Sequence, residues 1–238
     1  MSSVDNVNIC GFDIYSGSKK GCLEAIFSMG KVHVVSGNPE VLHTALFNPV
    51  LHDNFKSDST VIIPDGVGVN VAAKLNGLHI KEKIAGVELM VDIAKRCSET
   101  NKSIYLLGAT NESVNMCASN LKTMFPSLNV CGVHDGYFDN SESVIEKISD
   151  ASPDVLFVAL GCPKQEEFII SCMNSLPTSI FMGVGGSFDV ISGLKKRAPK
   201  VLVSLGLEWA YRVYKEPFRI KRLSVIPKFL IESMKKKD

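Results

Sequence analysis

One carboxylate, Asp65, directly follows the apolar run VIIP at 61–64 and precedes Gly66. A carboxylate at the end of a buried strand can act as a general base, which removes a proton from an attacking hydroxyl group. Pro64 restricts the backbone on one side, and Gly66 adds no side-chain bulk on the other. These neighbours favour a carboxylate held at an open edge. In a competing interpretation, Asp65 caps a helix that begins near Gly66.

Small, polar and acidic residues also follow other apolar runs. They are Ser36 and Asn38, Gly108 and Ala109, Gly161 and Gln165, and Gly185, Gly186 and Asp189. In an open parallel sheet, ligands bind at the carboxyl ends of the strands, and free N–H groups at the following helix starts suit phosphate. A single glycine after a strand usually marks only a turn. Several such segments at one edge indicate a ligand site.

Common cofactor and metal motifs are missing from the sequence. No G-x-G-x-x-G follows an early strand, and neither a P-loop nor H-E-x-x-H occurs. There is also no D-x-D pair of the kind that holds a divalent ion on a nucleotide diphosphate. The sequence therefore predicts no metal site and no bound cofactor. Cys131 and His134 remain an alternative nucleophile and base, although His134 could equally cap a loop.

Basic charge is concentrated near the C-terminus. Residues 195–238 contain thirteen Lys and Arg and four acidic residues, a net charge of +9, which leaves −8 for the rest of the chain. Such a block suggests an anionic partner, either phosphate, nucleic acid or an acidic membrane face, although a solvated helix surface is also possible. Apolar residues interleave with the charges in the pattern of an interfacial helix. They are Phe218, Leu223, Ile226, Phe229 and Leu230.

Short apolar runs alternate with longer helical segments, as in βαβ units around a parallel sheet. The expected strands lie at 32–36, 60–64, 103–108, 129–133, 154–160 and 179–184. Asn38 is expected to cap a helix with Pro39 in its first turn, and the Asn48-Pro49 pair to end it. The fold class is therefore α/β. We predict a Rossmann-like, mostly parallel sheet with flanking helices over residues 1–194, and a helical, basic appendage over 195–238.

Composition fits one globular chain of 238 residues, with 45% hydrophobic and 21% charged residues. The seven cysteines include no C-x-x-C pair, which favours reduced thiols in the cytoplasm. No targeting segment and no apolar run of about 18 residues is present.

Nine short blocks extend over nearly the whole chain. They are NPE at 38–40, PDGVGV at 64–69, IAGVEL at 84–89, YLLGAT at 105–110, HDGYF at 134–138, ALGCPKQE at 159–166, GVGGSFDVISG at 183–193, RAP at 197–199 and GLEWAYRVYKEPFRIKR at 206–222. In content and order they resemble the WecG/TagA/CpsF glycosyltransferases. The resemblance implies an inverting, metal-independent transfer of a sugar from a UDP-sugar to a polyprenyl-diphosphate-linked acceptor sugar, at the cytoplasmic membrane face. N-acetylmannosamine or a related hexose or uronic acid is the expected sugar, and teichoic acid or surface polysaccharide the expected product.

The resemblance also implies roles for individual residues. Asp65 matches the proposed base, while the substrate-binding residues are Ser36, Asn38, Lys83, Gln165, Arg212, Arg219 and Arg222. Many members have Thr in place of Ser36 and Arg in place of Lys83, and Lys lacks the planar fork of Arg. We assign nucleotide binding to Gly108, Ala109, Tyr137, Gly161, Gly185, Gly186 and Asp189. An anionic membrane surface and a homo-oligomer are expected partners, and nucleic acid is not.

From the residues alone, two other classes of function remain open. One is an NAD-dependent oxidoreductase on a Rossmann-like sheet. The other is a non-catalytic module that binds anions or membranes, for which the basic tail suffices. Thermal stabilisation by NAD but not UDP would favour the first, and a dispensable Asp65 the second.

Overall fold

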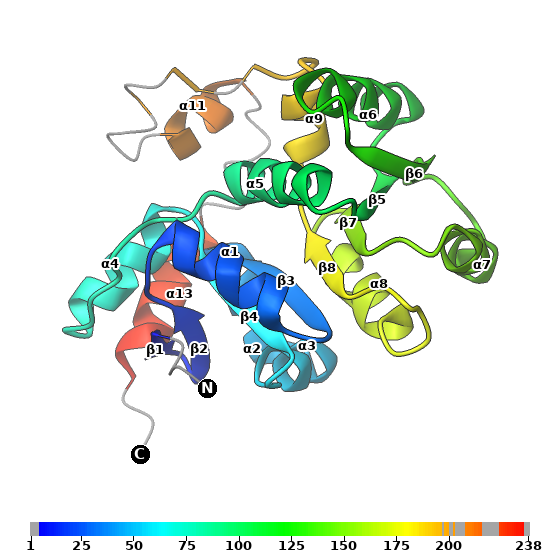
Figure 1. The fold of residues 1–238 in the computed structure, drawn as a ribbon. Coiled ribbons are helices and arrows are strands. Elements are labelled where there is room, and N and C mark those ends of the chain that lie inside the picture. Colours follow the sequence, from blue (N-terminus) through cyan, green and yellow to red (C-terminus); the bar gives the residue numbers. More distant parts are fainter. Residues whose placement is uncertain (1–4, 197, 200–201, 203–207, 216–223, 236–238) are drawn as a thin grey trace.

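The computed structural model describes residues 5–196, 198–199, 202, 208–215 and 224–235, and these form an α/β fold around one open sheet (Figure 1). The described strands lie in the order β1-β2-β4-β3-β8-β7-β5-β6. Their bounds are β1 Asn6–Ile9, β2 Phe12–Tyr15, β3 Val32–Gly37, β4 Thr60–Pro64, β5 Ser103–Gly108, β6 Asn129–His134, β7 Val155–Ala159 and β8 Ile180–Gly183. β1 and β2 pair antiparallel, and every other neighbouring pair is parallel.

The six strands predicted from the sequence, β3 to β8, are confirmed within one or two residues at each end. The hairpin of β1 and β2 was not predicted. Each of its strands has only four residues, too few for a clear alternation of apolar and polar side chains. Cys10 and Gly11 form its turn with φ angles of 56° and 83°, the two positive values that a tight hairpin turn requires.

Helices connect the strands and cover both faces of the sheet (Figure 1). Their bounds are α1 Lys19–Ser28, α2 Pro39–Phe47, α3 Pro49–Phe55, α4 Val67–Leu75, α5 Gly86–Glu99, α6 Asn111–Met124, α7 Ser141–Ala151, α8 Lys164–Cys172, α9 Ser187–Ile191, α11 Glu208–Lys215 and α13 Val225–Met234. The predicted caps are confirmed. The Asn38 side chain accepts hydrogen bonds from the N–H groups of Glu40 and Val41, and Asn48 ends α2 and caps α3 in turn.

The two faces bury separate sets of apolar side chains. Helices α1, α5, α6 and α9 pack on one face, around residues such as Val34 and Met182. On the opposite face, α2, α3, α4 and α13 pack on Val35, and α7 and α8 pack on Phe181. The neighbouring strands β3 and β8 thus lead to helices on opposite faces, α2 and α9. In α/β proteins, ligands bind at the carboxyl ends of two neighbouring strands whose connections diverge in this way.

The C-terminal helix α13 is part of the core. It packs against α2 and α4, and Phe229 is fully buried among their apolar side chains. Leu230 packs against the same cluster. The expectation that Phe229 and Leu230 face a membrane is therefore wrong, because these side chains pack against α2 and α4 within the protein. Phe218, Leu223, Arg219 and Arg222 lie outside the described residues, as does the side chain of Arg212 on α11.

The described helices include no membrane span. None of them combines the length and the apolar character needed to cross a bilayer.

Candidate active site

Asp65 lies just beyond the carboxyl end of β4, beside the end of β3. Its Oδ2 accepts a hydrogen bond of 2.6 Å from the hydroxyl group of Ser36, the penultimate residue of β3. A longer bond of 3.4 Å comes from the backbone N–H of Gly86, at the start of α5. Among the described residues, no donor contacts the other oxygen, Oδ1. The half-buried carboxylate thus has one oxygen held by the protein and one open to a ligand.

The structure excludes the interpretation of Asp65 as the cap of α4. The N-cap of that helix is Gly66, which has a φ angle of 86°, and no side chain bonds to the first turn. Asp65 instead lies at the start of a different helix, α5, where the positive end of the helix dipole favours a negative charge.

Gly86 was not predicted to belong to the site. A Cβ atom at this position would lie 3.2 Å from the Ser36 hydroxyl oxygen and 3.4 Å from Asp65 Oδ2, so a larger residue would crowd both groups. Its only signal in the sequence is its place in the IAGVEL block at 84–89. A glycine at a helix start has no spacing pattern that marks it as functional.

Lys83 is brought to the same edge by the connection between α4 and α5. Within this connection, the N–H of Lys81 donates to the carbonyl of Ser16 at 2.8 Å, and the N–H of Ile84 donates to the carbonyl of Pro64 at 3.1 Å. The connection is therefore fastened to the ends of β2 and β4. Lys83 lies half-buried between the two attachment points, and its contact with the substrate stays a prediction.

Asn38 is occupied as a helix cap, with bonds of 3.0 and 3.1 Å to its Oδ1, and its Nδ2 donates to the carbonyl of Ser36. Its side chain therefore supports the backbone beside Ser36. A direct contact of Asn38 with substrate stays a prediction.

Gln165 is buried, with only 4% of its surface exposed, so it does not face solvent as a simple helix-start residue would. Its Oε1 accepts hydrogen bonds from the N–H groups of Gly161 at 3.2 Å and Gly185 at 3.0 Å. Its Nε2 donates to Glu166 Oε1 at 2.7 Å. Gln165 thus joins the segments that follow β7 and β8. Its predicted contact with a sugar stays untested.

Glu166 was not predicted either, although it adjoins Gln165 in the sequence. The residue is 1% exposed, and among the described residues its Oε2 has no hydrogen-bond partner. Burial raises the pKa of this carboxyl group to about 7, against the lowering effects of the bonds from Gln165 and from its own backbone.

The Gly108-Ala109 pair is held against the end of β7. A Cβ atom at Gly108 would lie 2.4 Å from the carbonyl oxygen of Ala159, and the φ angle of Gly108 is 121°, so only glycine fits. Ala109 donates its N–H to the same carbonyl and accepts from the N–H of Gly136. Nearby, the Tyr137 side chain is 79% exposed. Nucleotide binding by Gly108, Ala109 and Tyr137 stays a prediction.

Asp189 is engaged within the protein. Its Oδ1 accepts a 2.8 Å bond from the Ser113 hydroxyl group, and its Oδ2 forms a 3.0 Å ion pair with Lys195. These contacts join α9 to α6 and to the start of the basic tail. Direct nucleotide binding by Asp189 stays a prediction.

Cys131 and His134 do not form a nucleophile–base pair. The Cys131 thiol donates to the carbonyl of Ile104, and His134 Nδ1 contacts the carbonyl oxygen of Asp135. Burial also raises the pKa of the Cys131 thiol, which disfavours the reactive thiolate. Among the residues that the structure describes, no group of three or more His, Cys, Asp or Glu side chains could hold a metal ion.

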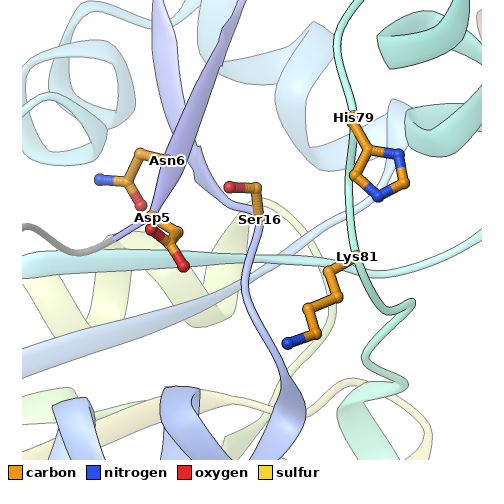
Figure 2. Close-up of a pocket in the computed structure, with 5 residues that line it drawn as sticks. All are labelled: Asp5, Asn6, Ser16, His79 and Lys81. Carbon is orange, nitrogen blue, oxygen red and sulfur yellow. The ribbon is translucent and has the colours of Figure 1, made fainter.

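A surface hollow lies at the same edge of the sheet, at the end of β2 (Figure 2). Its volume is about 440 Å³. The described residues that line it are Asp5, Asn6, Ser16, His79 and Lys81. It is therefore adjacent to the connection that carries Lys83, but it is not formed by Asp65 or the glycine segments.

Comparison with known proteins gives consistent matches over most of the chain. The model of the family described as "Glycosyl transferase WecG/TagA/CpsF family" matches residues 7–238. A protein of Bacillus spizizenii named N-acetylglucosaminyldiphosphoundecaprenol N-acetyl-beta-D-mannosaminyltransferase is 36% identical over 85% of this chain and 78% of its own length. A protein of the same name from Staphylococcus aureus strain MW2 is 33% identical over 99% of this chain and 95% of its own.

Proposed function

The chain belongs to the WecG/TagA/CpsF family of glycosyltransferases, and from this premise we propose that it transfers N-acetylmannosamine from UDP-N-acetylmannosamine to N-acetylglucosaminyl-diphosphoundecaprenol. The enzyme is a hexosyltransferase. Membership of the family also leaves the oxidoreductase and the non-catalytic binding module without support. We place the reaction in teichoic acid or surface polysaccharide synthesis, at the inner face of the cell membrane.

Asp65 carries the proposed mechanism, because one of its oxygens is fixed and the other is open. As the acceptor hydroxyl oxygen attacks the anomeric carbon, Asp65 Oδ1 takes its proton. The bond from the anomeric carbon to the UDP oxygen breaks on the opposite face, and UDP leaves with the bonding electron pair. A β-linked product from an α-linked nucleotide sugar is the result of this single inversion.

Ser36 and Gly86 support the base by holding its other oxygen. Both donate to Asp65 Oδ2, at 2.6 and 3.4 Å, so the carboxylate plane is set by two separate elements, β3 and α5. A base held in this way needs little reorganisation when the acceptor binds, which favours proton transfer.

The leaving diphosphate needs positive charge or hydrogen-bond donors. The glycine segments offer it fewer free N–H donors than the sequence suggested. The N–H groups of Gly161 and Gly185 already bond to Gln165, so they are not free for phosphate. We therefore assign the diphosphate chiefly to Lys83 and to Arg212, Arg219 and Arg222. Guanidinium groups can bind a diphosphate through paired, charge-assisted hydrogen bonds.

The proposed activity can be tested with purified protein and a soluble N-acetylglucosaminyl-diphosphate lipid analogue with a short chain. We expect transfer from UDP-N-acetylmannosamine to exceed transfer from UDP-N-acetylglucosamine, UDP-glucose and UDP-glucuronate. The measurement is disaccharide product by mass spectrometry, with NMR to establish the anomeric configuration. Faster transfer from another donor, or an α-linked product, would contradict the proposal.

We expect activity to persist in EDTA, because arginine and lysine can neutralise the leaving diphosphate without a divalent ion. The sequence has no D-x-D pair to hold such an ion on the nucleotide. Initial rates should be equal in EDTA, magnesium and manganese buffers. A loss of activity in EDTA that either metal restores would show that the enzyme needs a cation.

A further inference from the structure

A buried pair of neighbouring side chains, Gln165 and Glu166, lies at the start of α8 beneath the ends of β7 and β8. Their exposed fractions are 4% and 1%. Both pack over Gly183, the last residue of β8, where an added Cβ atom would lie 2.7 Å from Gln165 Nε2 and 3.1 Å from Glu166 Oε1. Two polar side chains so close to a strand end are costly to bury unless their hydrogen bonds are satisfied.

Gln165 satisfies its bonds by joining two loops. Its Oε1 accepts from the N–H groups of Gly161, after β7, and Gly185, after β8. These glycines have φ angles of 77° and 49°, so both adopt backbone conformations that other residues rarely reach. We call this three-residue arrangement the glutamine clamp. It fixes the relative position of two segments at the predicted nucleotide-binding edge.

Glu166 fixes the orientation of the clamp. Its Oε1 accepts the 2.7 Å bond from Gln165 Nε2, which directs Gln165 Oε1 towards the two glycines. If the amide turned over, an NH₂ group would face two N–H donors and an oxygen would face the Glu166 oxygen. Within the described part of the chain, Glu166 Oε2 has no partner and is buried.

We propose that Glu166 is a positioning residue that orients the glutamine clamp, and that gain or loss of its proton changes the affinity of the site for the diphosphate of the donor. The inference rests on the proposed function, because it takes a UDP-sugar as the ligand of this edge. It assigns Glu166 no contact with the sugar or with the reacting atoms.

The surroundings of Glu166 place its titration in the physiological range. Burial raises its pKa to about 7, and the charges of Glu167 on α8 and Glu40 on α2 act in the same direction. On α3, which also packs against α8, His52 and Asp53 contact one another. The packed strands β7 and β8 have no ionisable side chains, and Lys164 of α8 is exposed.

The direction of the effect follows from the charges. Below pH 7 the carboxyl group is mostly neutral, so it does not oppose the binding of a doubly negative diphosphate by the basic residues of the site. Above pH 7 the buried carboxylate adds a negative charge near the same edge and weakens donor binding. One added unit charge about 10 Å from the doubly negative diphosphate, at an effective dielectric constant of about 30 and with screening over a Debye length of about 10 Å, gives roughly a fourfold loss of affinity.

Glu166→Gln provides the test, because glutamine can still accept the bond from Gln165 but has no proton to lose. We would measure the dissociation constant of UDP-N-acetylmannosamine by calorimetry from pH 6 to pH 8. The diphosphate diester of this donor does not titrate in that range. Wild type should lose about threefold to fourfold in affinity, whereas Glu166→Gln should stay near the low-pH value of the wild type.

Glu167→Gln is the matched control, since it makes the same chemical change at the next residue, which is exposed and accepts a bond from Asn48. It should keep the size of the pH dependence of the wild type, with a midpoint at slightly lower pH because the charge of Glu167 raises the pKa of Glu166. If Glu166→Gln shows that dependence too, the proposal is wrong although the proposed function survives. If no variant binds a UDP-sugar at any pH, the proposed function fails first.

Thermal unfolding without ligand gives a second readout. A carboxyl group whose pKa is raised on folding, from 4.5 to about 7, binds its proton more tightly in the folded state. Its contribution to stability is therefore greatest at low pH and falls as the pH rises from about 4.5 to 7. The melting temperature of wild type should fall over this range relative to Glu166→Gln. Parallel curves for the two proteins would overturn the proposal.

Discussion

Replacing Asp65 with Asn is expected to lower turnover by about 10²-fold or more, the scale of a lost general base, and to leave UDP binding nearly unchanged. Asparagine has the same shape, and its oxygen can still accept the bonds of 2.6 and 3.4 Å from Ser36 and Gly86. It cannot take the proton of the acceptor hydroxyl group. The loss should therefore fall on kcat, with the dissociation constant of UDP as the second measurement.

Asp58→Asn is a suitable control for this variant. Asp58 is an exposed carboxylate shortly before β4, at the end of that strand opposite Asp65. It should retain wild-type turnover. If a folded Asp65→Asn protein also turned over at the wild-type rate, Asp65 would have no role as a base, and its bonds to Ser36 and Gly86 would only fasten β3, β4 and α5 together.

The strands and the helix cap that position the site could be predicted from the sequence, because each depends on residues close together in the chain. Apolar runs such as 60–64 and 103–108 are too short for helices, and their boundaries follow from the residues themselves. The Asn38 cap depends only on the nearby N–H groups of Glu40 and Val41. Parallel strands then place their carboxyl ends at one edge, so Asp65 and Ser36 could be expected to meet.

The direction of the Gln165 side chain could not be predicted in the same way. Whether a polar residue at a helix start points to a ligand or into the protein depends on the neighbouring loops. Here the N–H groups of Gly161 and Gly185, twenty-four residues apart in sequence, both donate to the buried oxygen of Gln165. Glu166 is informative for the same reason, since its raised pKa follows from burial that no local pattern reveals.

The position of the helix in the basic tail, residues 195–238, could not be predicted from its sequence pattern either. Interleaved apolar and basic residues fit both a membrane-bound helix and a helix packed on a protein core, because each has one apolar side. Phe229 decides between them for α13, where it is fully buried against α2 and α4. The net charge of +9 over 195–238 remains unexplained by this packing, and an anionic partner stays the natural proposal.

Replacing Arg212, Arg219 and Arg222 together with Gln is expected to lower kcat/KM by about 10³-fold on a soluble acceptor analogue. Each charged hydrogen bond to the diphosphate contributes about 1.5–3 kcal/mol, and no metal ion compensates in the proposed mechanism. Substitution is preferable to truncation at Arg197. A truncated chain would lack Phe229, and loss of a buried phenylalanine side chain costs about 3–5 kcal/mol of stability.

Lys235, Lys236 and Lys237 offer the matched control, because changing them to Gln removes the same charge from the same tail. Near an acidic bilayer, each basic residue contributes about 1 kcal/mol, so both triple variants should bind anionic liposomes more weakly and be released at lower salt. Only the arginine variant should lose turnover on the soluble acceptor, where membrane docking has no influence. Full turnover by the arginine variant would make these arginines membrane contacts alone. Stabilisation of the leaving UDP would then fall to Lys83, which the connection fastened to β2 and β4 holds at the same edge as Asp65.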